Sequence, residues 1–328
     1  MPKNVSAPPT AAPTAAVTVF RLAALFTFLA VAMGAVVCAT GSGASCPTWP
    51  GCQPDQITPQ WQLNPMIEFV HRVVAMTAGP LVLAAAVMSR RLPGHDRWAR
   101  ILPLVALAGA LAAGAFGRLV VLSGLPTWAG AVDFFCALTA MTAMGVAAVR
   151  VGAPRGYRPG LALRPAATWR PVQVRNLAGL SVIVVVVMHV TGIFAAARLS
   201  YTRCMGWPIW QLIDTDLHPR LQAVRLVLAV LAAALVVSTA VVAARNERLR
   251  RWGLLIAMVF AAEMVLGLVI RAGGINAGVA AAYSVLAVAL LFSLGLLMAV
   301  AWSAQIAADA TPLPPLEPSR EPAEPGRR

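Results

Sequence analysis

Apolar residues are grouped into eight long runs along this sequence, separated by short segments that are richer in polar and turn-forming residues. Each run has the length of about 20 residues that a helix needs to cross the hydrocarbon core of a bilayer. Since a helix satisfies its own backbone hydrogen bonds, we predict an all-α integral membrane protein with eight transmembrane helices. These cover residues 17–39, 66–88, 101–122, 127–149, 176–198, 221–244, 253–271 and 278–302.

The composition supports this assignment. The chain has 328 residues, of which 59% are hydrophobic and 12% are charged, and its mean hydropathy is +0.76. The net charge of +14 comes from arginines that are spread over the loops between apolar runs and do not gather in one patch. This distribution is typical of contact with membrane lipid, and it argues against a nucleic-acid partner.

The arginines also predict the orientation. They are concentrated after the second, fourth and sixth runs, whereas the loops after the odd-numbered runs hold few basic residues. By the positive-inside rule, we expect a multi-pass protein of the cell membrane with both termini in the cytoplasm and the loop at 40–65 on the outer face. The first run is long and lacks a small-residue cleavage site, so we expect it to be retained as a span.

The loop lengths of the first four runs recur in the same order in the last four, which predicts two tandem four-helix bundles of the same orientation. Two short sequences support an internal duplication: Cys46-Pro-Thr-Trp-Pro50 resembles Cys204-Met-Gly-Trp-Pro208. The predicted divisions are a disordered lead (1–16), an N-terminal half (17–149), an Arg-rich cytoplasmic linker (150–175), a C-terminal half (176–302) and a disordered tail (303–328).

Three ionisable residues lie close together near the outer end of the second run. Glu68 and His71 are three residues apart, and Arg72 follows Glu68 by four, so all three share one region of a helix. An ionisable residue inside a span is a functional hypothesis by default. One interpretation is a snorkelling cluster at the membrane interface. The other is an imidazole ligand for haem iron or another metal, beside a carboxylate that acts on substrate or protons.

Cys46 and Cys52 lie in one loop on the predicted oxidising side, which favours a disulfide that is either structural or redox-active. Cys38 and Cys136 fall in apolar runs, so we expect small core residues there. Cys204 has no second cysteine in its own loop, because Trp210 occupies the position that corresponds to Cys52, and we expect a free thiol.

Other polar residues lie inside the predicted spans. Asp133 is expected to find a basic or donor partner, and Tyr283 is either an interfacial aromatic or a pocket donor. Glu263 and Arg118 are candidates to pair with each other. His189 is either a ligand or a polar core residue.

Several of these segments together resemble the haem A synthase family. They are TGSGASCPTWPGC (residues 40–52), EFVHR (68–72) and GRLVVLSGLPTW (117–128), in an eight-helix duplicated layout. The resemblance implies an oxidoreductase that converts the C8 methyl group of haem O to formyl for cytochrome oxidase biogenesis. It assigns Glu68 as the catalytic carboxylate, His71 as an iron ligand, and Cys46 with Cys52 as the outer cysteine pair. Haem O would come from a membrane farnesyltransferase.

The same resemblance also shows where the chain departs from the family. The resemblance implies four axial histidines, two in each half, but after His71 the expected positions fall at or beside Asp133, at Val224 and near Tyr283. Arg225 is retained beside Val224. An accessory haem b in the second half is therefore doubtful, and we group Arg72, Asp133, Tyr283 and Arg225 as possible haem-pocket residues.

Three functions remain open from the sequence. The first is a divergent synthase that binds a substrate haem on His71, with Asp133, water or His189 opposite. The second is a non-catalytic haem-binding or oxidase assembly factor on the same fold. The third is a small membrane transporter, which the absence of paired Gly/Pro-broken helices disfavours.

Overall fold

Eight α-helices make up most of the computed structural model, which describes residues 12–92, 97–124, 126–153, 171–195, 201–208, 218–274 and 276–309. All eight are long and apolar enough to cross a membrane, and no strand occurs within the described ranges. The predicted fold class is therefore confirmed. The helices are α1 (Thr14–Ala39), α2 (Leu63–Arg91), α3 (Arg97–Leu122), α4 (Thr127–Gly152), α5 (Pro171–Ala195), α6 (Pro219–Ala244), α7 (Arg250–Gly273) and α8 (Ala277–Asp309).

Most helices extend beyond the apolar runs that predicted them, because polar residues continue their ends. α2 ends with Arg90 and Arg91 in its last turn, where cations interact favourably with the free carbonyls of a helix C-terminus. α5 begins at Pro171, inside the predicted linker, and α8 continues to Asp309, inside the predicted tail. Residues 1–11 of the lead, 154–170 of the linker and 310–328 of the tail lie outside the described residues.

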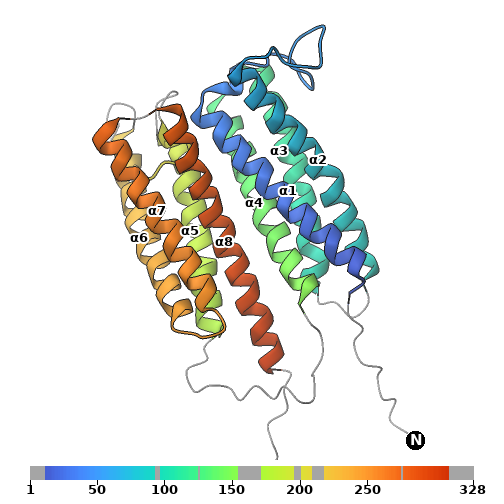
Figure 1. The fold of residues 1–328 in the computed structure, drawn as a ribbon, viewed down its shortest axis with the longest axis vertical. Coiled ribbons are helices and arrows are strands. Elements are labelled where there is room, and N and C mark those ends of the chain that lie inside the picture. The colour runs from blue at the N-terminus through green and yellow to red at the C-terminus, as the bar shows by residue number, and fades with distance from the viewer. Residues whose placement is uncertain are drawn as a thin grey trace, which may run out of the picture.

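The helices form two groups of four, one after the other along the chain (Figure 1). In the first group α1 packs against α2 and α4, and α3 packs against α2 and α4. In the second group α5 packs against α6 and α8, and α7 packs against α6 and α8. In each ring the diagonal helices, α2 and α4 or α6 and α8, therefore face each other across the interior.

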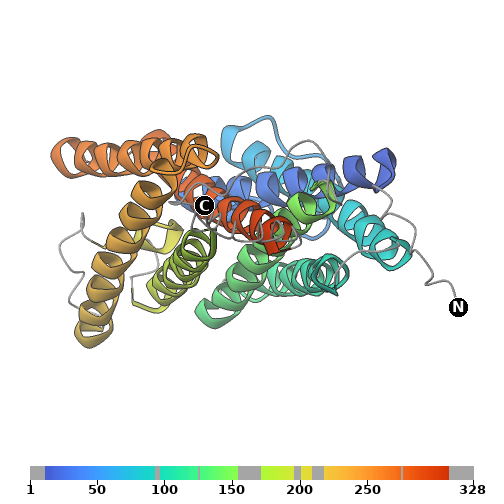
Figure 2. The same ribbon diagram turned by 90° about the horizontal axis from the view of Figure 1, so that it is seen from below.

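The two groups meet along α8, which packs against both α1 and α4, as the view from below shows (Figure 2). Phe28 of α1 stacks on Phe292 of α8 with 5.0 Å between ring centroids. Gly145 of α4 allows this approach, because a Cβ atom there would lie 2.7 Å from the Phe292 ring. Close-packed aromatic and small residues thus join the halves within the membrane-spanning region.

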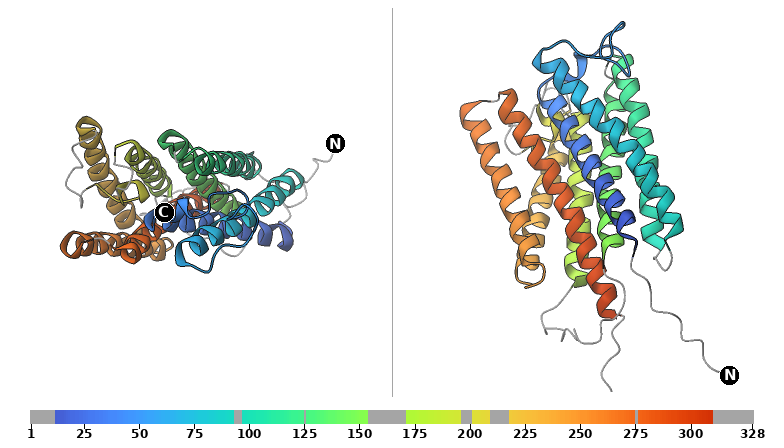
Figure 3. Two further views of the ribbon diagram at one scale, coloured as in Figure 1. Left: turned by 90° about the horizontal axis from the view of Figure 1, so that it is seen from above. Right: turned by 45° about the vertical axis from the view of Figure 1, so that its right-hand side comes forward.

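The helices run roughly parallel to one another, so their connections gather at two ends (Figure 3). α1 begins and α8 ends at the lower end of Figure 1, whereas the loop that carries Cys46 and Cys52 projects from the upper end. The chain is a multi-pass membrane protein by the length and composition of its helices.

Candidate functional site

The loop between α1 and α2 is closed by a disulfide between Cys46 and Cys52, and both cysteines are fully buried. α1 ends at Ala39, and the chain reverses at Gly41, whose φ of 66° is in the left-handed region that favours glycine. A short 3-10 helix (Ser42–Ala44) then leads into the disulfide. The loop is thus a small cross-linked cap on the upper end of the first four helices.

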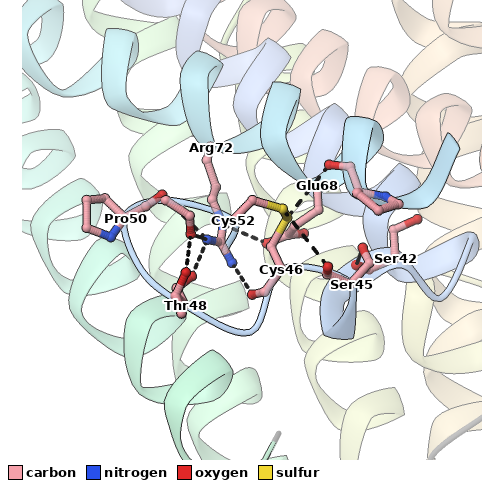
Figure 4. Close-up of a disulfide and its surroundings, with 10 residues drawn as sticks. Ser42, Ser45, Cys46, Thr48, Pro50, Cys52, Glu68 and Arg72 are labelled. Carbon is pink, nitrogen blue, oxygen red and sulfur yellow. Dashed lines mark hydrogen bonds and ion pairs between the residues drawn. A yellow bond between two sulfur atoms is a disulfide. The ribbon is translucent and has the colours of Figure 1, made fainter. Parts of the chain in front are cut away.

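Arg72 of α2 holds this cap in place (Figure 4). Its guanidinium donates to the carbonyl oxygens of Cys46 at 2.9 Å and Gly51 at 2.7 Å, and also to that of Thr48. Its Nε donates to Oε1 of Glu68 at 3.0 Å, and both side chains of this ion pair are buried. One planar cation therefore connects the loop backbone to the carboxylate, as suits the multiple fixed donors of arginine.

Glu68 and His71 each keep a buried polar atom without a hydrogen-bond partner among the described residues. These atoms are Oε2 of Glu68 and Nδ1 of His71. The imidazole lies against Gly34 of α1, where an added Cβ would approach Cε1 of His71 to 3.1 Å. Because buried polar atoms in native proteins are nearly always satisfied, two such atoms three residues apart make this part of α2 a candidate ligand-binding position.

Asp133 lies on α4, which is diagonal to α2 in the first ring. Its carboxylate faces Gly117 of α3, whose added Cβ would lie 3.7 Å from either oxygen. No donor from the described part of the chain bonds to it, so the expected basic or donor partner is not found there. Arg118, the neighbouring cation on α3, instead lies 5.6 Å above the ring of Trp49.

In the second group of helices, Arg225 and Tyr283 lie in a separate buried cluster. Nε of Arg225 donates to the Met188 carbonyl at 3.1 Å, and its Nη2 donates to the Gly206 carbonyl at 2.6 Å. The Tyr283 hydroxyl accepts from the backbone N–H of Trp207 at 3.4 Å. These two sequence-predicted residues therefore contact the loop of their own half and not the Glu68–His71 region.

His189 belongs to the same buried cluster. Its ring meets that of Trp207 edge-on at 6.3 Å between centroids. The Trp207 indole in turn donates to Oε1 of Glu263 at 2.8 Å. The structure thus groups His189 with residues of α7 and the second loop, whereas His71 packs on α1.

Two predictions about pairing are wrong. Cys204 is not a free thiol, and Cys38 is not a simple core residue, because the two form a disulfide across 166 positions of sequence. Cys136 alone is free among the described cysteines. Glu263 does not pair with Arg118, because its bond goes to Trp207 within the second half. Local spacing could not reveal either arrangement, since each depends on how the segments pack.

Sequence reasoning missed the roles of Trp207 and Arg72. The Trp-Pro pair of residues 207–208 was visible as a likeness to residues 49–50, but nothing local distinguishes a buried indole from an exposed one. Arg72 was grouped with haem-pocket residues, and the structure shows its bonds to the loop carbonyls. A signal was available for Arg72: Arg225 holds the same position relative to the second loop.

Residues 18–295 match the profile of the family described as "Cytochrome oxidase assembly protein". A heme A synthase of Symbiobacterium thermophilum is 28% identical over 185 residues, which cover 55% of this chain and 59% of that protein. A heme A synthase of Bacillus licheniformis is 26% identical over 236 residues, covering 69% of this chain and 76% of that protein. The match to the first of these spans less than two thirds of that relative's own length.

Proposed function

Because the chain belongs to the cytochrome oxidase assembly protein family, we propose that it is a haem A synthase-like membrane oxidoreductase. Its substrate is haem O, and its product is haem A, in which the C8 methyl group has become a formyl group. The observation that carries the proposal is the pairing of Glu68 and His71 on one face of α2, each with an unpartnered buried atom. A carboxylate and an imidazole so placed suit a porphyrin iron and a group undergoing oxidation.

His71 is the iron ligand in this proposal. Its Nδ1 makes no hydrogen bond with the described residues, and Gly34 leaves the imidazole room beside α1. When haem O is bound, its iron supplies the redox chemistry. Asp133, on the diagonal helix α4, lies at or beside the position that the family resemblance gives the second ligand, but a carboxylate or water is a weaker match for haem iron than imidazole. We expect a haem held chiefly through His71.

Glu68 is the catalytic carboxylate in this proposal. Arg72 fixes one oxygen by the 3.0 Å ion pair, so the carboxylate cannot rotate freely, and Oε2 remains to accept a proton from the reacting position. Conversion of a methyl group and water to a formyl group releases four protons and four electrons. The electrons must pass to an acceptor outside this chain, and Glu68 is positioned to receive protons.

The disulfide cap belongs to the outer face in this proposal, with both chain ends in the cytoplasm. The distribution of arginines and an oxidising environment for Cys46–Cys52 support that orientation. Haem O would arrive through the bilayer from a membrane farnesyltransferase, and haem A would leave for cytochrome oxidase assembly. The N-terminal half (17–149) would carry the reaction.

Co-expression with a haem O-producing enzyme tests the catalytic proposal. We expect the purified protein to carry haem and the cells to contain haem A, identified by the mass of its formyl group. His71→Ala should abolish the Soret band and the product. A colourless wild-type protein from haem-replete cells would contradict haem binding altogether.

A second function is favoured by a specific observation, the presence of Val224 and Tyr283 where the family has histidines. It is a haem-binding assembly factor that does not oxidise its haem. In the same experiment this alternative predicts bound haem O without any formyl product. The presence or absence of haem A therefore distinguishes the synthase from the assembly factor.

A further inference from the structure

The interior of the second helix ring contains a tryptophan that comes from the outer loop. We call residues 203–208 the outer plug. Trp207 of this plug is 2% exposed and is among the largest fully buried side chains. Its indole donates to Oε1 of Glu263 at 2.8 Å and lies 5.6 Å from the ring of Phe260, both on α7. The same indole lies edge-on to His189 of α5.

The backbone of the outer plug is bonded to the other two helices of the ring. Arg225 of α6 donates to the Gly206 carbonyl at 2.6 Å. From α8, the Ser284 hydroxyl donates to the Cys204 carbonyl at 2.5 Å, and the Tyr283 hydroxyl accepts from Trp207. The plug therefore contacts α5, α6, α7 and α8. Since α5 and α7 are diagonal in this ring, and so are α6 and α8, a group that reaches all four lies at the centre.

The corresponding loop of the first half is placed differently. Trp49 corresponds to Trp207 but is 43% exposed, and it contacts Arg118 at the surface. The cap is bonded to α2 through Arg72, and its tryptophan does not enter the bundle. The first half thus keeps its loop on top, whereas the second half brings its loop inside.

A porphyrin bound between α6 and α8 would need the space that the outer plug occupies. Protein interiors are close-packed, so the indole and a macrocycle cannot share that volume. Val224 is 53% exposed and Tyr283 is bonded to the plug, so neither supplies an iron ligand. We propose that the second half binds no haem and that Trp207 fills its interior, which leaves one haem per chain, on His71.

His189 does not restore a second site. Both of its ring nitrogens lack hydrogen-bond partners among the described residues, which by itself would suit a ligand. However, its ring contacts the plug indole, and the Arg225 guanidinium packs on Gly192, less than one turn further along α5. A haem iron would have to displace Trp207 and approach a buried cation. His189 is therefore a buried polar residue that packs against Trp207 in the filled interior.

The number of haems bound per chain tests the proposal. The expected value of one haem per chain rests on the haem binding that we propose for His71. The probes are the full-length wild type, His71→Ala and His189→Ala from haem-replete cells, with haem measured as the pyridine haemochrome per chain. We expect one, zero and one. Two haems per wild-type chain, or haem retained by His71→Ala, would overturn the filled interior while leaving haem binding intact. A wild type without haem would instead contradict the proposed function.

A second measurement does not depend on haem. Trp207→Ala and the matched control Trp49→Ala are prepared from haem-depleted cells, and their melting temperatures are compared with that of the wild type. We expect a clear loss for Trp207→Ala and little change for Trp49→Ala, with Trp207→Phe between them because it keeps a ring but loses the bond to Glu263. Equal melting temperatures for Trp207→Ala and Trp49→Ala would show that the indole does not fill the bundle, and would overturn the proposal.

Discussion

Each half has an arginine that donates to the preceding loop, and the arginine of the first half also forms an ion pair with a carboxylate. Arg72 and Arg225, each near the start of the second helix of its half, both donate to a backbone carbonyl of the preceding loop, that of Cys46 and that of Gly206. In the first half a histidine precedes the arginine, and in the second half a valine does. The comparison teaches that the two residues of this motif have separable tasks. An arginine is bonded to the loop in both halves, whereas a histidine precedes it in the first half alone.

A comparison of the two buried glutamates gives the largest expected effect. Glu68→Gln should lower haem A formation by about 100-fold or more, because general acid–base catalysis typically contributes that much. Glu263→Gln should leave it unchanged, since an amide oxygen still accepts the bond from Trp207. Product per bound haem, measured by mass, checks both. Equal activity of Glu68→Gln and the wild type would remove Glu68 from the reaction.

Replacing each of the two arginines should lower stability by different amounts, because Arg72 also pairs with a buried carboxylate. Arg72→Ala leaves Glu68 buried without its cation, which costs about 3–5 kcal/mol. Arg225→Ala leaves two carbonyls without their donor and costs about 1–3 kcal/mol. Thermal unfolding in detergent measures both changes. The double variant Glu68→Gln/Arg72→Ala should be more stable than Arg72→Ala alone, because it has no unpaired buried charge. Equal stability of the two would show that the unpaired Glu68 carboxylate does not cause the stability loss of Arg72→Ala.

The Cys38–Cys204 disulfide predicts that the two halves stay covalently linked after the chain between them is cleaved. A protease site placed in the segment 154–170 should yield two fragments on a reducing gel and one joined species without reductant. Cys38→Ser should release the fragments under both conditions and lower stability by about 2–4 kcal/mol. The matched double variant Cys46→Ser/Cys52→Ser, which leaves no competing thiol in that loop, should leave the fragments joined. Separation of the wild-type fragments without reductant would exclude the Cys38–Cys204 bond.

Substitutions of the glycines that contact Arg225 and His71 should have the smallest effects on stability and on the haem spectrum. Gly192→Ala would place a methyl group 2.7 Å from the Arg225 guanidinium and should cost about 1–3 kcal/mol. Gly34→Ala would crowd His71 at 3.1 Å and should shift the Soret band with a smaller loss of stability. Gly79 has open space around it, so Gly79→Ala serves as the control. An unchanged spectrum for Gly34→Ala would argue against iron ligation by His71.

The eight helices could be predicted from the sequence, because each apolar run must cross the bilayer and satisfy its own backbone. Glu68, His71 and Arg72 stood out for the related reason that charge inside a span is costly. The opposite placements of Trp49 and Trp207 could not be predicted, since both follow a cysteine by three residues and precede a proline. The burial of Trp207 depends on how α5, α6, α7 and α8 pack around its loop, with Glu263 of α7 as acceptor, and no local pattern shows that.

The Cys38–Cys204 bond also has a consequence for biogenesis. During synthesis Cys38 is made with the first helix, but its partner Cys204 is made only after α5. In that interval Cys38 is a thiol close in sequence to Cys46 and Cys52, and thiolates exchange with nearby disulfides. We therefore expect correct pairing to need early closure of the Cys46–Cys52 disulfide. Cys38 is then still a free thiol when Cys204 is made, and the two can form their bond.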